Sequence, residues 1–420
     1  MLSHAGKSVL LLCTTTGYQT HSFLAAARKL NTRVVLGSDR CHVLDDPWRD
    51  GALALRFEEP EASAAKLLEY ARKHKVDGVV AIGDQPTSLA ASVAQALGLP
   101  GHPPAAADMC RDKYRSRLRL REAGLQVPAF QRFARQSDPH EVAHAVIFPC
   151  VLKPLALSGS RGVIRANDAE ELADAFTRIN KLLGKAEIGA LHDPANNFIQ
   201  VEDYVDGIEI AVEGLVDAGQ LRVLAIFDKP DPLIGPFFEE TIYVTPSRLS
   251  AQMQAEIVRV LQGAVQALGL WSGPLHAEMR LNSGGAWVLE VAARPIGGLC
   301  ARSLRFQEGI SLEEVILRHA LGERLEPKRE TCASGVMMIP IPRAGFLERV
   351  EHVEAAAGTP GVEAIEITAK LRQELVPLPE GASYLGFIFA RGETPEFVEQ
   401  ALRQAHGKLN FVISPALRVV

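Results

Sequence analysis

Two glutamates on a predicted β-hairpin are the strongest chemical signal in this sequence. Residues 275–281 and 287–293 have the composition of two strands, with a turn around residues 283–285. Because side chains alternate along a strand, a three-residue loop sets Glu278 directly opposite Glu290, whereas a two-residue loop puts them on opposite faces. Paired carboxylates repel each other unless a cation neutralises them. The hairpin therefore predicts a site for a hard cation such as Mg²⁺; the alternative is that one glutamate faces solvent.

A lysine and a glycine-rich stretch form the second candidate. Lys153 ends an apolar strand expected over residues 148–153, and the sequence Ser-Gly-Ser-Arg-Gly follows at 158–162. An ammonium group reaches phosphate as a point charge, and flexible backbone N–H groups wrap phosphate oxygens. The GK[ST] ending of a P-loop is absent, and a surface turn beside a lysine is the commoner explanation for this pattern alone.

Two further acids, Glu202 and Glu209, flank an expected turn at Asp206 and Gly207. Their carboxylates could accept hydrogen bonds from a sugar hydroxyl or an adenine amino group. Exposed acids beside a turn are routine, so this segment carries little information by itself. The same holds for Lys113, which alone is typical of a solvated helix surface.

The composition excludes several classes of protein. Hydrophobic residues make up 47% of the 420 residues and charged residues 23%, unlike a disordered or fibrous chain. Lys and Arg number 45 against 50 Asp and Glu, so the net charge is −5 and nothing indicates nucleic-acid binding. No apolar run is long enough to cross a bilayer. Six widely spaced cysteines without a CxxC pair favour a reducing cytoplasm over a disulfide framework or a zinc site.

The elements that must position these residues begin with an alternation of strands and helices. Strands are expected at 8–13, 33–37 and 76–82, and helices at 20–30 and 85–97, which predicts a parallel sheet covered by helices. The turn at residues 14–19 lacks the G-x-G-x-x-G of a dinucleotide site. One helix is expected over 105–122, a mixed middle part begins at 124, and a strand-rich tail begins at 334.

The order of these signals along the chain is more informative than any one of them. A lysine on a helix, a lysine before a glycine-rich loop, a Glu-x-x-Val with a later Glu, and two glutamates with an arginine follow one another. In this order the sequence resembles ATP-grasp enzymes over nearly its whole length. It is closest to their L-amino acid ligase branch in three stretches: residues 238–247 (FEETIYVTPS), 273–278 (GPLHAE) and 290–298 (EVAARPIGG).

This resemblance implies an α/β fold of the ATP-grasp type in several parts. A Rossmann-like pre-ATP-grasp domain would occupy residues 1–104, and a linking helix residues 105–123. The ATP-binding and catalytic core would extend over 124–325, and a C-terminal α+β domain over 326–420.

The resemblance also implies a place for ATP. The phosphate groups would be contacted by two lysines and a mobile loop, namely Lys113, Lys153, Ser158, Gly159, Ser160 and Gly162. Adenine would be held, largely through backbone groups, by Glu202, Asp203 and Val205. Glu209 would bind the ribose.

The remaining implied roles concern the metal and the substrates. Glu278 and Glu290 would bind the metal, and Arg294 would meet the transferred phosphoryl group. The substrates would be contacted by Glu240, which holds an amino group, and by Tyr243, Arg294, Gly297 and Gly298. Two positions depart from the family pattern. Ala292 stands where many members have Asn, which removes an oxygen ligand, and Tyr243 stands where the branch often has His.

The activity implied is that of a cytoplasmic ATP-dependent carboxylate–amine ligase. The γ-phosphoryl group of ATP would pass to an amino acid carboxylate, and the amine of a second amino acid would displace phosphate, giving a dipeptide, ADP and phosphate. Such transfer needs positioning and charge neutralisation more than a protein nucleophile. His276 is a candidate for deprotonating the amine, with a structural strand histidine as the alternative.

The implied cofactors are ATP and Mg²⁺, with Mn²⁺ as a substitute. The expected partners are small-molecule substrates and a second copy in a homodimer, with no nucleic acid and no membrane. Two other functions stay open: a purine-pathway type of ATP-grasp ligase or carboxylase, and a nucleotide-binding protein without catalysis, which the missing Asn permits.

Overall fold

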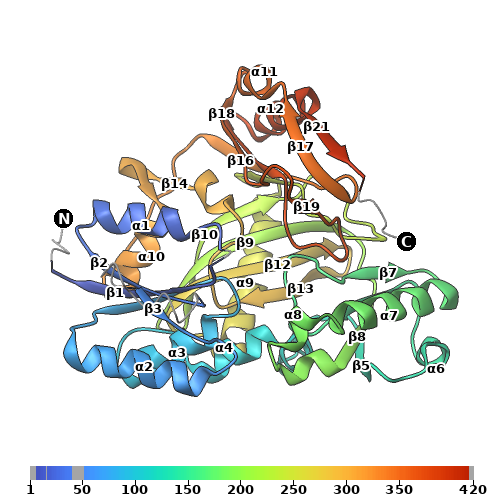
Figure 1. Cartoon of the computed structure of the whole chain (residues 1–420), viewed down its shortest axis with the longest axis horizontal. Helices are drawn as coiled ribbons and strands as arrows, with labels where there is room; N and C mark the ends of the chain where they lie inside the picture. The colour runs from blue at the N-terminus through green and yellow to red at the C-terminus, as the bar shows by residue number, and fades with distance from the viewer. Residues whose placement is uncertain (1–5, 16, 40–51, 416–420) are drawn as a thin grey trace.

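The computed structural model describes residues 6–15, 17–39 and 52–415, so residue 16 of the turn at 14–19 lies outside the described part (Figure 1). The chain begins with a parallel sheet in the order β3-β2-β1-β4. Its strands are β1 (Ser8–Cys13), β2 (Arg33–Ser38), β3 (Ala52–Ala54) and β4 (Gly78–Ile82). Every residue of β1 is buried, as expected for a central parallel strand covered on both faces. The expected α/β alternation is confirmed.

Helices cover this sheet and lead out of it. They are α1 (Thr20–Lys29), α2 (Pro60–Lys73), α3 (Thr87–Ala96), α4 (Pro104–Arg111) and α5 (Lys113–Glu122). The single helix expected over 105–122 is wrong, because the chain is extended at Asp112. The Asp112 carboxylate accepts a hydrogen bond from the Arg115 N–H at 3.1 Å and so caps a new helix. This break makes Lys113 the first residue of α5.

A second, four-stranded sheet has the order β5-β8-β6-β7. It consists of β5 (Phe130–Ala134), β6 (Cys150–Pro154), β7 (Ile164–Ala166) and β8 (Phe198–Asp203), with helices α6 (Pro139–His144), α7 (Ala169–Leu183) and α8 (Ala186–Gly189). The apolar face of α7 packs on β6, β7 and β8 around buried Leu172, Phe176 and Ile179. This unit, drawn in green, lies to one side of the large sheet (Figure 1).

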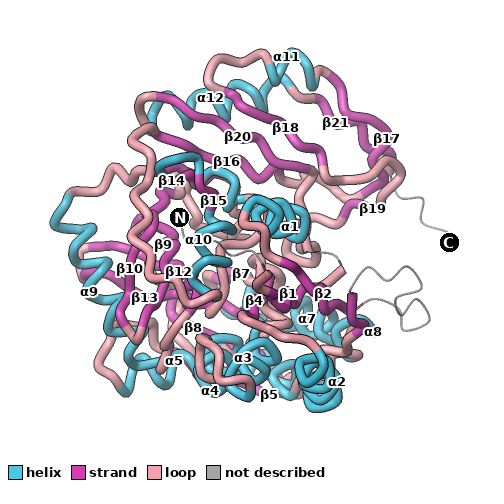
Figure 2. The backbone as a smooth tube through the Cα atoms, turned by 90° about the vertical axis from the view of Figure 1, so that its left-hand side faces the viewer, coloured by secondary structure: helices cyan, strands magenta, loops and turns pink. Residues whose placement is uncertain are grey.

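The largest sheet has eight strands in the order β13-β12-β9-β10-β11-β16-β20-β18. Their bounds are β9 (Ile208–Asp217), β10 (Gln220–Asp228), β11 (Ile242–Thr245), β12 (Gly273–Asn282), β13 (Gly285–Ala292), β16 (Ala333–Ile339), β18 (Val362–Ile367) and β20 (Gly386–Gly392). Helix α9 (Ala251–Leu268) packs on β10 and β13. The last three strands of this order come from beyond residue 326, so the catalytic and C-terminal parts share one sheet (Figure 2).

The rest of the chain completes the C-terminal lobe and its junction. Strands β17 (Gly345–Glu351), β19 (Glu374–Leu375) and β21 (Asn410–Ser414) form a three-stranded sheet. Helices α11 (Val353–Ala357) and α12 (Pro395–Lys408) pack against β18 and β20 of the large sheet, respectively. Between the lobes lie β14 (Arg305–Phe306), β15 (Ile310–Ser311) and α10 (Leu312–Ala320).

One apolar core joins three lobes: the N-terminal sheet, the middle strands of the large sheet, and the strands beyond residue 326. It contains Leu11 from β1, Phe227 from β10 and Phe387 from β20, all fully buried. The β5-β8-β6-β7 sheet has a separate core, around Leu172, Phe176 and Ile179. Among the described residues, no helix combines the length and apolar character needed to span a membrane.

Candidate active site

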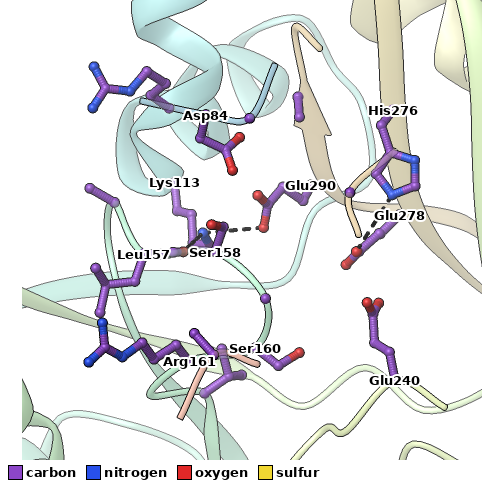
Figure 3. A pocket seen from close by; sticks show the side chains of 18 of the residues that line it. Asp84, Lys113, Leu157, Ser158, Ser160, Arg161, Glu240, His276, Glu278 and Glu290 are labelled. Carbon is purple, nitrogen blue, oxygen red and sulfur yellow. Dashed lines mark hydrogen bonds and ion pairs between the residues drawn. The ribbon is translucent and has the colours of Figure 1, made fainter. Parts of the chain in front are cut away.

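A cavity of about 600 Å³ lies where the three lobes meet. Its walls include Asp84 after β4, Lys153 on β6, Glu278 and Glu290 on the hairpin, and Tyr384 from the C-terminal lobe. The structure brings all the candidate residues from the sequence to this cavity except Gly162. Figure 3 shows how acidic and basic side chains from different lobes face one another across it.

The hairpin reaches the expected pairing by an unexpected route. Its turn is two residues long, since Asn282 pairs with Gly285, so the predicted three-residue loop is wrong. That turn by itself would put the glutamates on opposite faces. However, the register shifts beside Leu289, where β13 holds one residue more than β12, and Glu278 becomes the direct partner of Glu290. A β-bulge, and not the turn, creates the pair of carboxylates.

Lys113 is the cation nearest to this pair. Its Nζ donates a hydrogen bond of 2.7 Å to the Leu157 carbonyl and lies 3.2 Å from Glu290 Oε2 (Figure 3). The contact with Leu157 connects α5 to the start of the glycine-rich loop. The ion pair connects a lysine expected at the phosphates with an acid expected at the metal, so each neutralises the other.

The second expected phosphate lysine, Lys153, donates to a buried carboxylate, Glu202. Glu202 also accepts from Arg117 Nε at 2.6 Å and from Gln200 Nε2 at 2.6 Å. Burial alone raises the pKa of Glu202, but the charges of Arg117 and Lys153 outweigh it and lower the pKa to about 2. The Glu202 side chain is therefore engaged with these cations, and an adenine contact at this residue is restricted to its backbone.

Replacing Glu202 by glutamine is expected to destabilise the fold by about 3–5 kcal/mol near neutral pH, because two buried cations lose their counter-charge. A lowered carboxylate pKa contributes stability above the unfolded value of 4.5, and this contribution is lost as the pH falls towards about 2. We therefore expect the free energies of unfolding of wild type and Glu202→Gln, measured with urea, to differ less as the pH falls below 4.5. A difference in unfolding free energy that does not change with pH would contradict the lowered pKa of Glu202. The control is Glu69→Gln, which removes an acid from an exposed pair with Lys73 and should leave the unfolding free energy unchanged.

The glycine-rich loop is attached to the C-terminal lobe. The Gly162 N–H donates to the Pro379 carbonyl at 2.8 Å, and Arg161 Nε donates to the Glu380 carbonyl at 2.9 Å. Gly159 and Ser160 have φ values of 65° and 54°, a left-handed turn that presents the loop to the cavity. The loop thus faces the expected phosphate region while its far end contacts another lobe.

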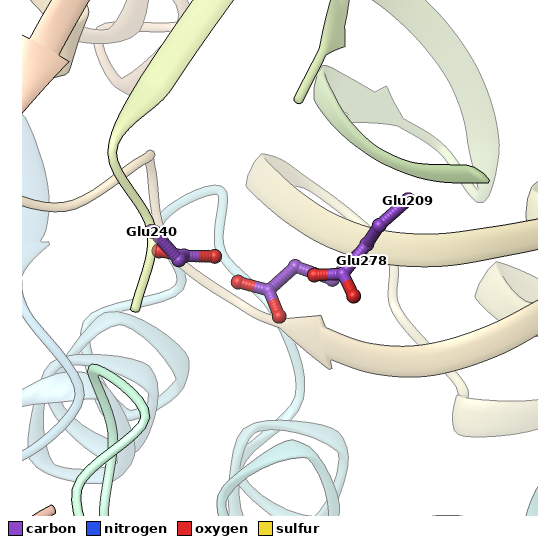
Figure 4. A group of neighbouring side chains, drawn as sticks. All are labelled: Glu209, Glu240 and Glu278. Atoms are coloured by element: carbon purple, nitrogen blue, oxygen red, sulfur yellow. The ribbon is translucent and has the colours of Figure 1, made fainter. Parts of the chain in front are cut away.

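Three carboxylates meet deeper in the cavity. Oxygens of Glu209, Glu240 and Glu278 all lie within 4.8 Å of one another (Figure 4). Burial raises the pKa of Glu240, and repulsion from Glu278 adds to it, so that the pKa is about 7 although Lys229 opposes the shift. Sequence reasoning missed Lys229, which donates to Glu209 at 2.9 Å and also to Glu240.

Arg294 makes a bidentate pair that sequence reasoning also missed. Its Nε and Nη2 donate to the two oxygens of Asp84 at 2.7 Å and 3.0 Å. Burial alone raises the pKa of Asp84, but Arg294 outweighs it and lowers the pKa. The sequence did contain a signal for Asp84 as a site residue. This acid follows a buried parallel strand, and ligands bind at the carboxyl edge of such sheets.

Family models match three successive parts of the chain. They are the ATP-grasp N-terminal domain over residues 24–101, the ATP-grasp domain over 146–303, and the L-amino acid ligase C-terminal domain 2 over 337–414. The crystal structure of an L-amino acid ligase from Bacillus licheniformis superposes with a TM-score of 0.83 at 27% identity, covering 97% of this chain and 99% of that one. The chain belongs to the L-amino acid ligase branch of the ATP-grasp superfamily.

Two curated proteins are similar to this chain. The ligase is 25% identical to the uncharacterized protein y4rH of Sinorhizobium fredii, over 97% of this chain and 84% of that protein. It is 26% identical to the alanine–anticapsin ligase of Bacillus subtilis, over 71% of this chain and 66% of that enzyme. The alignment thus spans slightly less than two thirds of the second relative. The resemblance stated from the sequence is confirmed, as are the ATP-grasp fold and the class of ADP-forming C–N ligase.

His276 of the ligase is held by a buried acid. Its Nδ1 lies 3.1 Å from Glu213 Oε2, and Glu213 is completely buried. Burial lowers the pKa of His276, but hydrogen bonds with Glu213 and Glu278 outweigh it and raise the pKa to about 9. The pairing with buried Glu213 fits the alternative of a structural strand histidine, and deprotonation of the amine by His276 stays a prediction.

Two of the expected substrate contacts, Tyr243 and Gly298, lie beside the C-terminal lobe, since β11 pairs with β16 and Gly298 lies against Phe387. Tyr243 is buried on β11, and its ring centroid lies 5.1 Å from Lys229 Nζ. Gly297 and Gly298 follow Arg294. Gly298 has a φ of 58°, and an added Cβ would lie 3.0 Å from the Phe387 ring, so a side chain there is strained and crowded.

The donor set of the ligase fits a magnesium ion. Glu278 and Glu290 face each other across the bulged pair, and hard carboxylate oxygens are the ligands that Mg²⁺ takes together with substrate phosphates. Ala292 lines the same cavity without a side-chain oxygen. Enzymes of this superfamily use ATP with Mg²⁺, and the assignment of these two glutamates to the ion remains a prediction.

Proposed function

We propose that this ligase activates an amino acid carboxylate with ATP and joins it to the amine of a second amino acid, giving a dipeptide, ADP and phosphate. The observation that best supports this function is that one cavity holds Glu240, a carboxylate suited to an amino group, beside the paired acids Glu278 and Glu290. An amino acid bound through its ammonium group at Glu240 would place its own carboxylate towards the phosphoryl site.

The basic residues of the cavity would act on the developing charge. Lys113 and Lys153 would bind the phosphate oxygens of ATP, and Arg294 would neutralise the transferred group. When bound, Mg²⁺ supplies further positive charge at the phosphates. The bond between the γ-phosphorus and the bridging oxygen of ADP breaks as a bond from that phosphorus to an oxygen of the substrate carboxylate forms. The neutral amine then attacks the acyl carbon, phosphate leaves, and the proton of the amine passes to the released phosphate or to solvent.

The loop beside the cavity would protect the acylphosphate from hydrolysis. The loop at residues 158–162, attached to the C-terminal lobe, would exclude water from the acylphosphate. His276, paired with Glu213 and 3.9 Å from Glu278, would lie beside the metal-binding acids, either as the base for the amine or as a structural residue. The adenosine would lie beside Lys153, which donates to Glu202. The proposed contacts of the adenosine are Glu202, Asp203, Val205 and Glu209. A homodimer remains a prediction.

The direct test is ATP consumption by the purified protein with Mg²⁺ and pairs of the twenty amino acids, with ADP, AMP and product mass measured together. We expect ADP and phosphate only with particular pairs, together with a dipeptide mass. AMP with pyrophosphate would overturn the acylphosphate mechanism. Phosphate release that requires bicarbonate or a phosphoribosylamine would indicate a purine-pathway reaction, and nucleotide binding without turnover would indicate a non-catalytic protein.

A further inference from the structure

Lys229 lies among three carboxylates that belong to three different parts of the proposed reaction. It follows β10, and its side chain is 3% exposed. Its Nζ is 2.9 Å from Glu209 Oε1 and 3.7 Å from Glu278 Oε1, and it donates to Glu240 Oε1. In the proposed function these acids serve the ribose, the metal and the substrate amine.

The carboxylates alone have the spacing of a metal-ligand set. Their oxygens lie within 4.8 Å of one another, and Figure 4 shows the three side chains converging. Three such charges in a buried place repel one another strongly unless a cation lies among them. In this protein the cation is already present, because the ammonium group contacts all three acids.

The surroundings of Lys229 match an ammonium group better than a metal ion. The ammonium group donates hydrogen bonds to two of the acids, Glu209 and Glu240, and lies at ion-pair distance from the third, Glu278. The Tyr243 ring lies 5.1 Å from Nζ and favours a cation over its face. Arg280 Nε donates to the second oxygen of Glu209 at 2.9 Å, so each oxygen of that carboxylate accepts a hydrogen bond from a cation.

We propose that Lys229 is the resident cation of this cluster. Its ammonium group takes the place of a metal ion among Glu209, Glu240 and Glu278, and positions each acid for its own ligand. The metal is thereby confined to the side of Glu278 that faces Glu290. The roles of the three acids, for the ribose, the metal and the substrate amine, rest on the proposed function. The position of the cation among them rests only on the contacts of Lys229.

The test is to count Mn²⁺ ions bound per chain by electron paramagnetic resonance, with and without ADP, in wild type, Lys229→Met and Lys229→Arg. We expect Lys229→Met to bind one Mn²⁺ more than wild type, because the three acids become a hard-oxygen site. Added Mn²⁺ should also raise the Tm of this variant, while Lys229→Arg should bind the wild-type number. An unchanged count and an unchanged Tm response in Lys229→Met would overturn the proposal, since a purely structural lysine lowers the Tm without creating a metal site.

Two variants that keep Lys229 make the test independent of whether Lys229→Met folds. With ADP present, Glu290→Gln should weaken Mn²⁺ binding about tenfold or more, as expected for a lost ligand, and Glu240→Gln should leave it unchanged. Loss of Mn²⁺ binding in Glu240→Gln would overturn the proposal. Ion counting requires no turnover, so a wild-type protein that makes no dipeptide but binds Mn²⁺ as expected would contradict the proposed function alone.

Discussion

Replacing Glu290 by alanine is expected to abolish ATP turnover while the protein stays folded. Glu290 faces Glu278 across the bulged strand pair, and its side chain is 28% exposed at the cavity. Removing it takes away one of the two carboxylates proposed for the metal and the ion-pair partner of Lys113. Because a phosphoryl transition state depends on charge neutralisation, both losses act on the rate.

The measurement is ADP formation in the presence of a productive amino acid pair, together with the Tm of the variant. A small change in Tm is expected, since the side chain is partly exposed. Glu366→Ala, which removes an acid from β18 in the same sheet but outside the cavity, should retain wild-type turnover. Retained turnover in folded Glu290→Ala would remove the metal assignment.

Replacing Arg294 by alanine is expected to lower kcat by about 10³-fold or more, the range found for arginines that stabilise a phosphoryl transition state. The guanidinium group is buried at the cavity and held by both oxygens of Asp84, so its position is fixed before any substrate binds. Lysine at this position should restore only part of the rate, because an ammonium group cannot reproduce the bidentate geometry.

The same variant leaves Asp84 without its partner, and this effect must be separated from a direct role in the reaction. The double variant Arg294→Ala, Asp84→Asn removes both charges and so avoids a buried unpaired carboxylate. Steady-state rates of the double variant should stay as low as those of Arg294→Ala. Recovery of the rate would show that Arg294 serves to neutralise Asp84, and near-normal rates in Arg294→Ala alone would make it a salt-bridge residue.

Much of the fold followed from local patterns. The apolar run that follows Ser8 in β1, and the alternation of strands and helices, predicted the parallel sheet, because a strand covered on both faces buries every side chain. The break at Asp112 could have been found, since Asp before a helical segment is a common N-cap. The sharing of one sheet by β11 and β16 could not, because their pairing joins residues about ninety positions apart.

The site can be divided in the same way, into what the sequence predicted and what only the tertiary structure decided. Residue types and order alone determined the family, the two cavity lysines and the pair of hairpin acids, since these depend on which groups carry charge and where strands end. The tertiary structure decided how they are connected: the bulge beside Leu289 sets Glu290 opposite Glu278, and Asp84 holds Arg294.

Lys229 is the clearest case of a residue whose role the sequence does not carry. In the chain it is one lysine after a strand, and in the fold it lies among Glu209, Glu240 and Glu278. The physical reason is that burial and neighbouring charge set the state of an ionisable group, and both depend on strands distant in sequence. The sequence by itself determined which chemical groups this ligase possesses, and only the packing of its three lobes decided which of them neutralise one another.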